Sequence, residues 1–160
     1  MWLFKILLIF TFLIIFIQDY KSRLVYWFLY PIVGLLAFLI QTKENSFIIA
    51  STNSSINILF ITLILLFCFL YAKLKLKKKF VNEVIGVGDI LFFVFISFSF
   101  SILSFMVFFV FSLLFSLMVH FVLKNKEKDI TIPLAGYMSF FFATIYSISF
   151  FYNCFFLFAY

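Results

Sequence analysis

Residues 90–123 read ILFFVFISFSFSILSFMVFFVFSLLFSLMVHFVL, an uninterrupted run of 34 residues that contains no Asp, Glu, Lys or Arg. As one helix the run would measure about 51 Å at roughly 1.5 Å per residue, whereas the hydrocarbon core of a bilayer is about 30 Å thick. We therefore expect two shorter helices, joined by a tight turn near residues 97–104. This division determines whether the chain crosses a membrane five or six times.

Apolar runs also fill most of the remaining sequence. They predict four further helices, at about residues 2–18, 24–40, 56–72 and from 132 to near the C-terminus, with a polar loop at 41–55. The hydrophobic fraction is 67% and the charged fraction 11%, with a mean hydropathy of +1.27, whereas a soluble domain carries about 25% charged residues. We expect a single all-α domain over residues 1–160, a polytopic membrane protein with six transmembrane helices.

The basic residues predict how these helices are oriented. Segments 19–23, 73–88 and 124–129 hold two, five and three of the twelve Lys and Arg residues, and only Lys5 and Lys43 fall elsewhere. Six crossings place all three segments on one side of the membrane, which the positive-inside rule makes cytoplasmic. We then expect a retained first helix and both termini on the outer face of the plasma (inner) membrane. The basic clusters suit a lipid surface, so the net charge of +6 does not indicate a nucleic-acid partner.

The two cysteines do not indicate a metal or redox site. Cys68 and Cys154 each lie inside an apolar run, without a C-x-x-C pattern or a nearby histidine. A structural zinc site normally needs four ligands. We expect both thiols to pack in apolar surroundings, and we expect neither a metal nor a cofactor.

The acidic residues are few, and two of them occupy unusual positions. The six are Asp19, Glu44, Glu83, Asp89, Glu127 and Asp129. Only Asp19 and Asp89 lie directly at a junction with an apolar run, and they are 70 residues apart in the sequence. In the six-helix topology both lie at the cytoplasmic edge of the membrane, at the same depth.

Two interpretations of these aspartates are open. Each acid could mark a helix end, because a carboxylate is favoured at a helix N-terminus. That explains Asp89, but it explains Asp19 poorly, since Asp19 follows its helix. Alternatively the two form a catalytic pair that shares one proton, in which one carboxylate activates a water molecule and the other donates to a scissile carbonyl.

The glycines next to Asp89 favour the catalytic pair. Gly86 and Gly88 are two of only four glycines in the chain, and they flank Val87 immediately before the acid. Glycine permits unusual torsions and lets another chain come close. A protease needs that space, because its substrate must lie extended beside the acid.

Three segments, in order along the chain, resemble the type IV prepilin peptidases, a family of membrane aspartic leader peptidases that includes the preflagellin peptidases. Asp19–Val25 resembles the first aspartate motif, in which basic residues follow the acid and a branched residue, here Val25, comes six positions later. Gly86–Asp89 resembles the family's G-x-G-D motif. Ile132–Tyr137, which contains Pro133, resembles the Ile-Pro segment that opens the last helix.

The resemblance implies a function and a set of roles. Asp19 and Asp89 would be the catalytic residues, with Gly86, Gly88, Val25 and Pro133 as supporting motif positions. The family's core has six helices, needs no cofactor or metal, and cuts basic leaders from prepilin-like proteins at the cytoplasmic membrane face. The expected partners are therefore a prepilin-like substrate and the lipid bilayer.

The chain departs from the family pattern in two places. Tyr26 stands where many members have proline, a position that shapes the helix entry. The larger members also carry a cytoplasmic insert with paired cysteines and methylate the new N-terminus. This chain has no such insert, which argues against N-methyltransferase activity.

Other functions remain open at this stage. Presenilin-like proteases share a G-x-G-D motif, but they are larger and their acids lie on neighbouring helices later in the chain. The chain could also be a non-catalytic membrane component, such as a transporter subunit or a filament-assembly scaffold, or a peptidase homologue kept for binding. His120, the single histidine, fits an interfacial position at a helix end better than a catalytic one.

Overall fold

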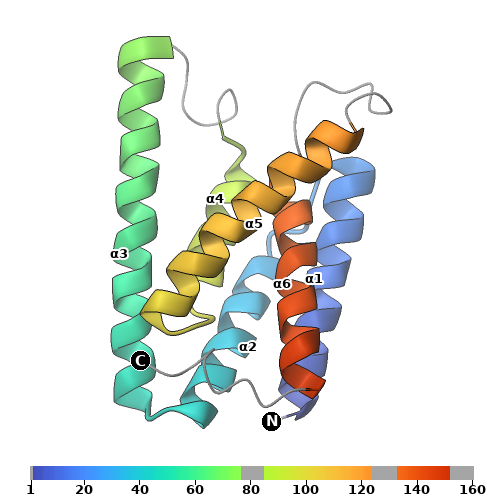
Figure 1. Ribbon diagram of the computed structural model, residues 1–160, viewed down its shortest axis with the longest axis vertical. Coiled ribbons are helices and arrows are strands. Elements are labelled where there is room, and N and C mark those ends of the chain that lie inside the picture. Colours follow the sequence, from blue (N-terminus) through green and yellow to red (C-terminus); the bar gives the residue numbers. More distant parts are fainter. Residues whose placement is uncertain (1, 77–84, 124–132, 152–160) are drawn as a thin grey trace.

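The computed structural model describes residues 2–76, 85–123 and 133–151, and over these residues the chain is built from helices joined by short connections. The helices are α1 (Trp2–Ser22), α2 (Leu29–Glu44), α3 (Phe47–Tyr71) with its π-helical continuation η1 (Ala72–Leu76), α4 (Val87–Ile96), α5 (Ile102–Leu123) and α6 (Leu134–Phe151) (Figure 1). The expected all-α class is therefore confirmed.

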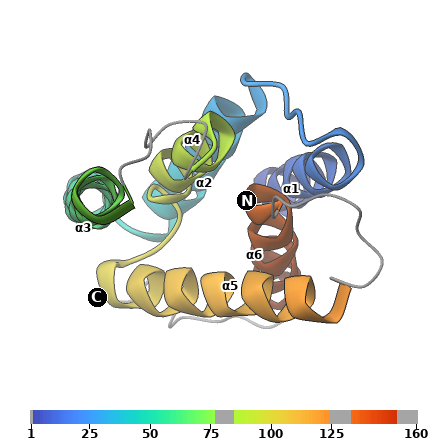
Figure 2. The ribbon, with the colours of Figure 1, turned by 90° about the horizontal axis from the view of Figure 1, so that it is seen from above.

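The helices alternate in direction. α1, α3 and α5 run towards one end of the molecule, and α2, α4 and α6 run back (Figure 1). Seen from above, α1 lies against α6 and α2 against α4, while α3 stands at the periphery and α5 crosses one side at a steep tilt (Figure 2). The ends of α1, α3 and α5 and the starts of α4 and α6 thus belong to the same end of the bundle.

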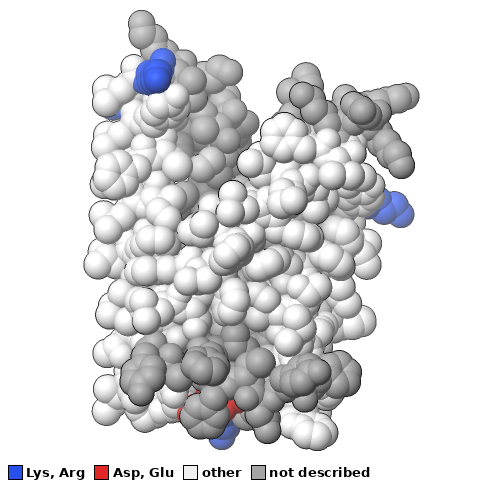
Figure 3. Space-filling model, viewed as in Figure 1, with Lys and Arg blue, Asp and Glu red and all other residues white. Residues whose placement is uncertain are grey.

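The surface is that of a membrane protein. Three stretches, Trp2–Ser22, Phe47–Lys75 and Ile102–Leu123, are long and apolar enough to cross a bilayer. Charged side chains are few on the visible face, most of which is uncharged (Figure 3). α2 and α4 are shorter, at 16 and 10 residues. Three apolar helices of membrane-spanning length therefore fit the expected membrane protein, whereas the count of six crossings stays a prediction.

The long apolar run divides as its length predicts. α4 ends at Ile96 and α5 begins at Ile102, and between them lies a tight turn, Ser97–Ser101, that we call the inner turn. The side chains of Ser97, Ser99 and Ser101 are fully buried. α4 measures about 15 Å at roughly 1.5 Å per residue. The chain therefore reverses inside the protein, where no water is available to satisfy the exposed carbonyl groups.

Asn57 of α3 completes the inner turn. Its Nδ2 atom donates to the carbonyl oxygens of Ser97 and Phe100, both at 3.0 Å. The Asn57 side chain is fully buried. A buried carbonyl without a partner would cost about 1–3 kcal/mol. Asn57 thus supplies hydrogen bonds in the interior of the bundle.

The loop expected at residues 41–55 is wrong. α2 continues to Glu44 and α3 begins at Phe47, capped by the Ser46 hydroxyl, which accepts from the N–H of Ile49. Part of its polarity serves the interior, because Gln41, Asn53 and Ser54 are buried, whereas most of its other polar residues are exposed. Gln41, for example, is fully buried and donates from Nε2 to the Phe100 carbonyl at 3.2 Å.

The second helix also starts later than expected. It begins at Leu29 instead of residue 24, which places Pro31 in its first turn. The first four N–H groups of a helix have no partner inside the helix, so proline costs no hydrogen bond there. No compensating partner is therefore needed for Pro31.

An aromatic core holds the helices together below the end of the bundle at which α1 ends and α4 and α6 begin. Phe12 lies 6.2 Å from Phe142 and 6.3 Å from Phe92 between ring centroids, and Phe100 stacks on Tyr146 at 5.1 Å. All five side chains are fully buried. Offset and edge-to-face ring contacts at such distances are favourable beyond the burial of apolar area. This core fixes α1, α4 and α6 relative to one another.

Candidate functional site

Asp19 lies in the last turn of α1 and points into the bundle. Its side chain is only 9% exposed, and its Oδ2 atom accepts a hydrogen bond from the N–H of Gly136 at 2.5 Å. The helix stops just beyond it, where Arg23 adopts a left-handed conformation with φ of 54°. The Gln18 Oε1 atom then accepts from the N–H of Tyr26 and fixes the exit of the chain.

Asp89 lies in the first turn of α4, three residues after the N-cap Gly86. An acid at this position reaches back to the N-cap N–H, as in a capping box, and Asp89 makes that contact with Gly86. Its Oδ1 atom also accepts from the N–H of Ala135 at 3.0 Å. The carboxylate therefore joins the start of α4 to the start of α6.

The two acids converge on consecutive residues. Ala135 binds Asp89 and Gly136 binds Asp19, and both donors lie in the first turn of α6. Adjacent Cα atoms are about 3.8 Å apart, and the charge of Asp19 acts directly on Asp89. The structure thus brings together two carboxylates that are far apart in the sequence; we call them the aspartate pair.

The environment of Asp89 favours its protonated form. Asp89 belongs to none of the three helices that are long enough to span a membrane. Its pKa is raised to about 6, first by burial and then by the charge of Asp19, while the N–H groups of Ala135 and Gly86 act in the opposite direction. A pair of carboxylates of which one holds a proton up to about pH 6 is suited to general acid–base chemistry.

Three of the four glycines make room for this site. A Cβ atom at Gly86 would lie 3.2 Å from Asp89 Oδ2, and one at Gly136 would lie 3.0 Å from both Cβ and Oδ2 of Asp19. A Cβ atom at Gly88 would lie 2.8 Å from the hydroxyl of Tyr30. The fourth glycine packs against a phenylalanine away from the acids.

Sequence reasoning missed Tyr30, Ala135 and the role of Gly136. Tyr30 is 2% exposed, and its hydroxyl interacts electrostatically with both carboxylates. Tyr30 belongs to no sequence motif, because it reaches the site only through the packing of α2 on α4. Ala135 and Gly136 lie in the Ile132–Tyr137 segment, whose resemblance to the Ile-Pro motif was the one signal that pointed to the start of α6.

The other motif positions, Pro133 and Val25, lie next to helix ends. Pro133 is buried directly before α6, and its carbonyl accepts from the N–H of Tyr137 at 3.2 Å. Val25 lies between α1 and α2 and packs against the core. Ile132 lies outside the described residues. Both residues therefore lie next to helix ends, Pro133 before α6 and Val25 after α1.

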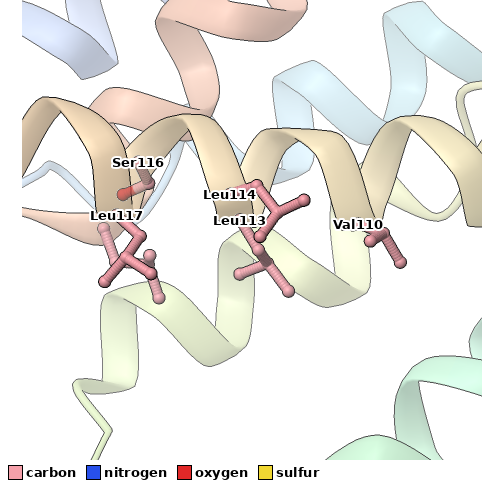
Figure 4. Close-up of a pocket in the computed structure, with 6 residues that line it drawn as sticks. Val110, Leu113, Leu114, Ser116 and Leu117 are labelled. Carbon is pink, nitrogen blue, oxygen red and sulfur yellow. The ribbon is translucent and has the colours of Figure 1, made fainter.

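A hollow of about 340 Å³ adjoins the start of α6. Figure 4 shows its lining side chains on α5, and Leu134 of α6 completes it; the α5 residues are Val110, Leu113, Leu114, Ser116 and Leu117. Leu134 directly precedes Ala135, the partner of Asp89. The hollow is almost wholly apolar, so it suits an apolar group close to the aspartate pair.

The remaining candidate residues lie apart from the pair or beyond the described part. Lys5 and Glu44 form an ion pair at 3.8 Å at the opposite end of the bundle. His120 is half-buried near the end of α5, and Cys68 is a half-buried free thiol on α3. Among the described residues no group of three His, Cys, Asp or Glu side chains is placed to hold a metal. Outside those residues lie Glu83, Glu127, Asp129, Cys154 and most of the lysine clusters.

Comparison of the chain with models of known protein families, with curated proteins and with solved structures gave no match.

Proposed function

We propose that this protein is a membrane aspartic endopeptidase that removes the leader peptide from prepilin-like precursors at the cytoplasmic face of the membrane. The observation that carries the proposal is the convergence of Asp19 and Asp89 on adjacent N–H groups of α6. The resemblance of Asp19–Val25 and Gly86–Asp89 to the motifs of the prepilin peptidases supplies the reaction and the substrate class.

Helix capping alone does not explain the pair. One carboxylate suffices to complement the N-terminus of a helix, and α6 receives two. The second like charge raises the electrostatic energy of the site, and the two acids come from separate helices. Such an arrangement is typical of a site in which two carboxylates share one proton.

The pair supports hydrolysis of an amide without a cofactor. The ionised carboxylate takes a proton from a water molecule as that water attacks the scissile carbonyl carbon. The protonated carboxyl gives its proton to the carbonyl oxygen, which yields a neutral tetrahedral diol. Collapse of the diol breaks the C–N bond: the protonated carboxyl gives its proton to the leaving amine while the other carboxylate takes a hydroxyl proton of the diol, so the pair ends with the single proton with which it began.

The proposed topology follows the expected one. Six helices cross or enter the plasma membrane, with both termini outside and the ends of α1, α3 and α5 on the cytoplasmic side. The exposed Lys73 and Lys75 at the end of α3, and the lysines that follow them, would contact anionic lipid head groups. The aspartate pair then lies at the membrane edge, where a leader enters from the cytoplasm.

Co-expression with a precursor tests this function. The reporter is a precursor with a lysine-containing leader, a glycine before the cleavage point and an apolar helix after it. We expect cleavage by the native chain and none by Asp19→Asn or Asp89→Asn, with all three proteins present in the membrane fraction. Glu44→Gln is the matched control, because it neutralises an acid at the opposite end of the bundle. Undiminished cleavage in either aspartate variant would leave the chain as a non-catalytic membrane component.

A further inference from the structure

Gly88 and Tyr30 fit together more closely than any side chain at position 88 would allow. A Cβ atom built on Gly88 lies 2.8 Å from the Tyr30 hydroxyl oxygen, but 3.7 Å from the ring carbon that bears it. The first distance is below normal contact, and the second is an ordinary van der Waals contact. The hydroxyl group alone therefore occupies the space that a side chain on residue 88 would need.

Tyr30 has little freedom to move away. Its side chain is 2% exposed, and its ring meets Phe92 edge-on at 6.4 Å between centroids. It lies in the first turn of α2, next to Pro31, whose ring fixes the backbone torsion φ. A packed aromatic ring reorients only if its neighbours shift. The hydroxyl is thus held beside residue 88 by its surroundings.

The hydroxyl also lies beside the residue that precedes Asp89. Gly88 directly precedes Asp89, and Tyr30 interacts electrostatically with both Asp19 and Asp89. Within the described residues, the charge of Arg23, just beyond the end of α1, also acts on Asp19. A phenol is a neutral group that can both donate and accept a hydrogen bond. It can therefore stabilise an ionised carboxylate without adding a charge to a site that already holds two acids.

We propose that Tyr30 is a positioning residue of the aspartate pair, and that residue 88 is glycine because the Tyr30 hydroxyl occupies the place of its side chain. The proposal rests on the proposed peptidase function for its kinetic consequences, but not for its geometry. The hydroxyl orients the carboxylate that is ionised and so helps to keep a single proton on the pair. It acts through the acids and not on the substrate.

A titration of the carboxyl groups tests the geometry independently of any activity. The chain has only three aspartates, so ¹³C labelling of aspartate Cγ gives three resonances in detergent micelles. Tyr30→Phe should move the Asp89 titration to higher pH by roughly half a unit or more, because the state in which both carboxylates are ionised then loses a polar group that stabilises it. Asp129 should not move.

Tyr146→Phe is the matched control for this titration. Tyr146 is also fully buried, but its hydroxyl donates to the Ser99 carbonyl at 3.3 Å, at the inner turn. It should leave the Asp89 titration in place. An unchanged Asp89 titration in Tyr30→Phe, or an equal shift in Tyr146→Phe, would overturn the proposal whether or not the protein proves to be a peptidase.

A double-variant cycle tests the pairing of residues 30 and 88. With the reporter precursor, Tyr30→Phe should lower kcat about tenfold and leave KM within about twofold, because the hydroxyl acts on the acids and not on substrate binding. Gly88→Ala should lower kcat by about tenfold or more in the native chain, since the added methyl displaces the hydroxyl. In the Tyr30→Phe background the same change should cost less than about threefold.

The two backgrounds also separate misfolding from the proposed role. Recovery of a folded, membrane-inserted protein in the double variant, where Gly88→Ala alone is impaired, would support the steric pairing. An equal cost of Gly88→Ala in both backgrounds would overturn it. If no chain cuts the reporter, the peptidase function fails, and the ¹³C titration still decides the role of Tyr30.

Discussion

The inner turn and the start of α6 both expose backbone groups inside this apolar protein, yet different chemistry completes them. At the inner turn the exposed groups are carbonyls, and the neutral amide of Asn57 donates to two of them. At the start of α6 the exposed groups are N–H donors, and two carboxylates accept from them. The polar groups of the first region only need hydrogen-bond partners, whereas the proposed function requires those of the second to react as well.

This difference distinguishes a structural region, the inner turn, from the candidate functional region at the start of α6. Neutral amides meet the needs of buried carbonyls at low electrostatic cost. Two carboxylates on one helix end add mutual repulsion, which burial strengthens. We infer that the inner turn was shaped for stability and that the start of α6 gives up stability to hold Asp19 and Asp89 together.

Replacement of either aspartate should have the largest effect on activity. Asp19→Asn and Asp89→Asn should each lower reporter cleavage by at least about a hundredfold, because a general acid or base contributes roughly 10²–10⁴ in rate. Asparagine keeps the shape and an accepting oxygen for the α6 N–H groups. Thermal unfolding in micelles should therefore show a folded protein. A loss of folding in both variants would instead indicate a structural role.

Gly136→Ala should have the next largest effect on activity. The added Cβ would lie 3.0 Å from the Cβ of Asp19, an atom close to the backbone that cannot swing aside. α1 and α6 must then separate slightly, and a small displacement of a catalytic group can cost up to about a hundredfold in rate. We expect a loss of about tenfold in kcat. Gly34→Ala is the control, because its Cβ would meet Phe95 and not an acid.

Asn57→Leu should have the opposite effect: it should lower stability and leave activity nearly unchanged. The change removes both donors from the inner turn and leaves the Ser97 carbonyl without its partner, while Gln41 still donates to Phe100. The free energy of unfolding should fall by about 1–3 kcal/mol. Cleavage per folded molecule should stay within about twofold of the native value. A selective loss of cleavage without a loss of stability would contradict the division between the two regions.

The aspartate pair should also make the stability of the fold depend on pH, and this effect should be smaller than those above. The pKa of Asp89 is raised from 3.8 to about 6 in the folded protein. The folded state therefore binds the proton more tightly than the unfolded state, and this contribution to stability is present below about pH 4 and is lost as the pH rises through 6. Asp89→Asn should remove that dependence, as measured by melting temperature between pH 4 and 7.

Much of the site was predictable because charge is so rare in this chain. The apolar runs and lysine clusters placed Asp19 and Asp89 at one end of the bundle, and the structure brings their carboxylates together there. The length of the run at 90–123 predicted the inner turn. These predictions succeeded because a bilayer strongly limits where polar groups and charges can lie.

The parts that failed depend on contacts between helices. The polar character of 41–55 indicated a loop, because sequence does not show that Gln41 would meet a carbonyl 59 residues away. Tyr30 resembled any other aromatic residue of a span until α2 was packed against α4. The need for glycine at position 136 is apparent only from the packing of Asp19 against it. Such pairings arise from tertiary packing, for which local patterns give no signal.

The most direct test of the aspartate pair is cleavage of the reporter precursor by the purified, reconstituted protein in water enriched in ¹⁸O. If Asp19 and Asp89 activate a water molecule, mass spectrometry should find one ¹⁸O atom in the new carboxyl terminus of the released leader. Asp19→Asn and Asp89→Asn should release no leader. An intact precursor with the native chain, or equal cleavage by either variant, would contradict the assignment of the pair as a catalytic centre.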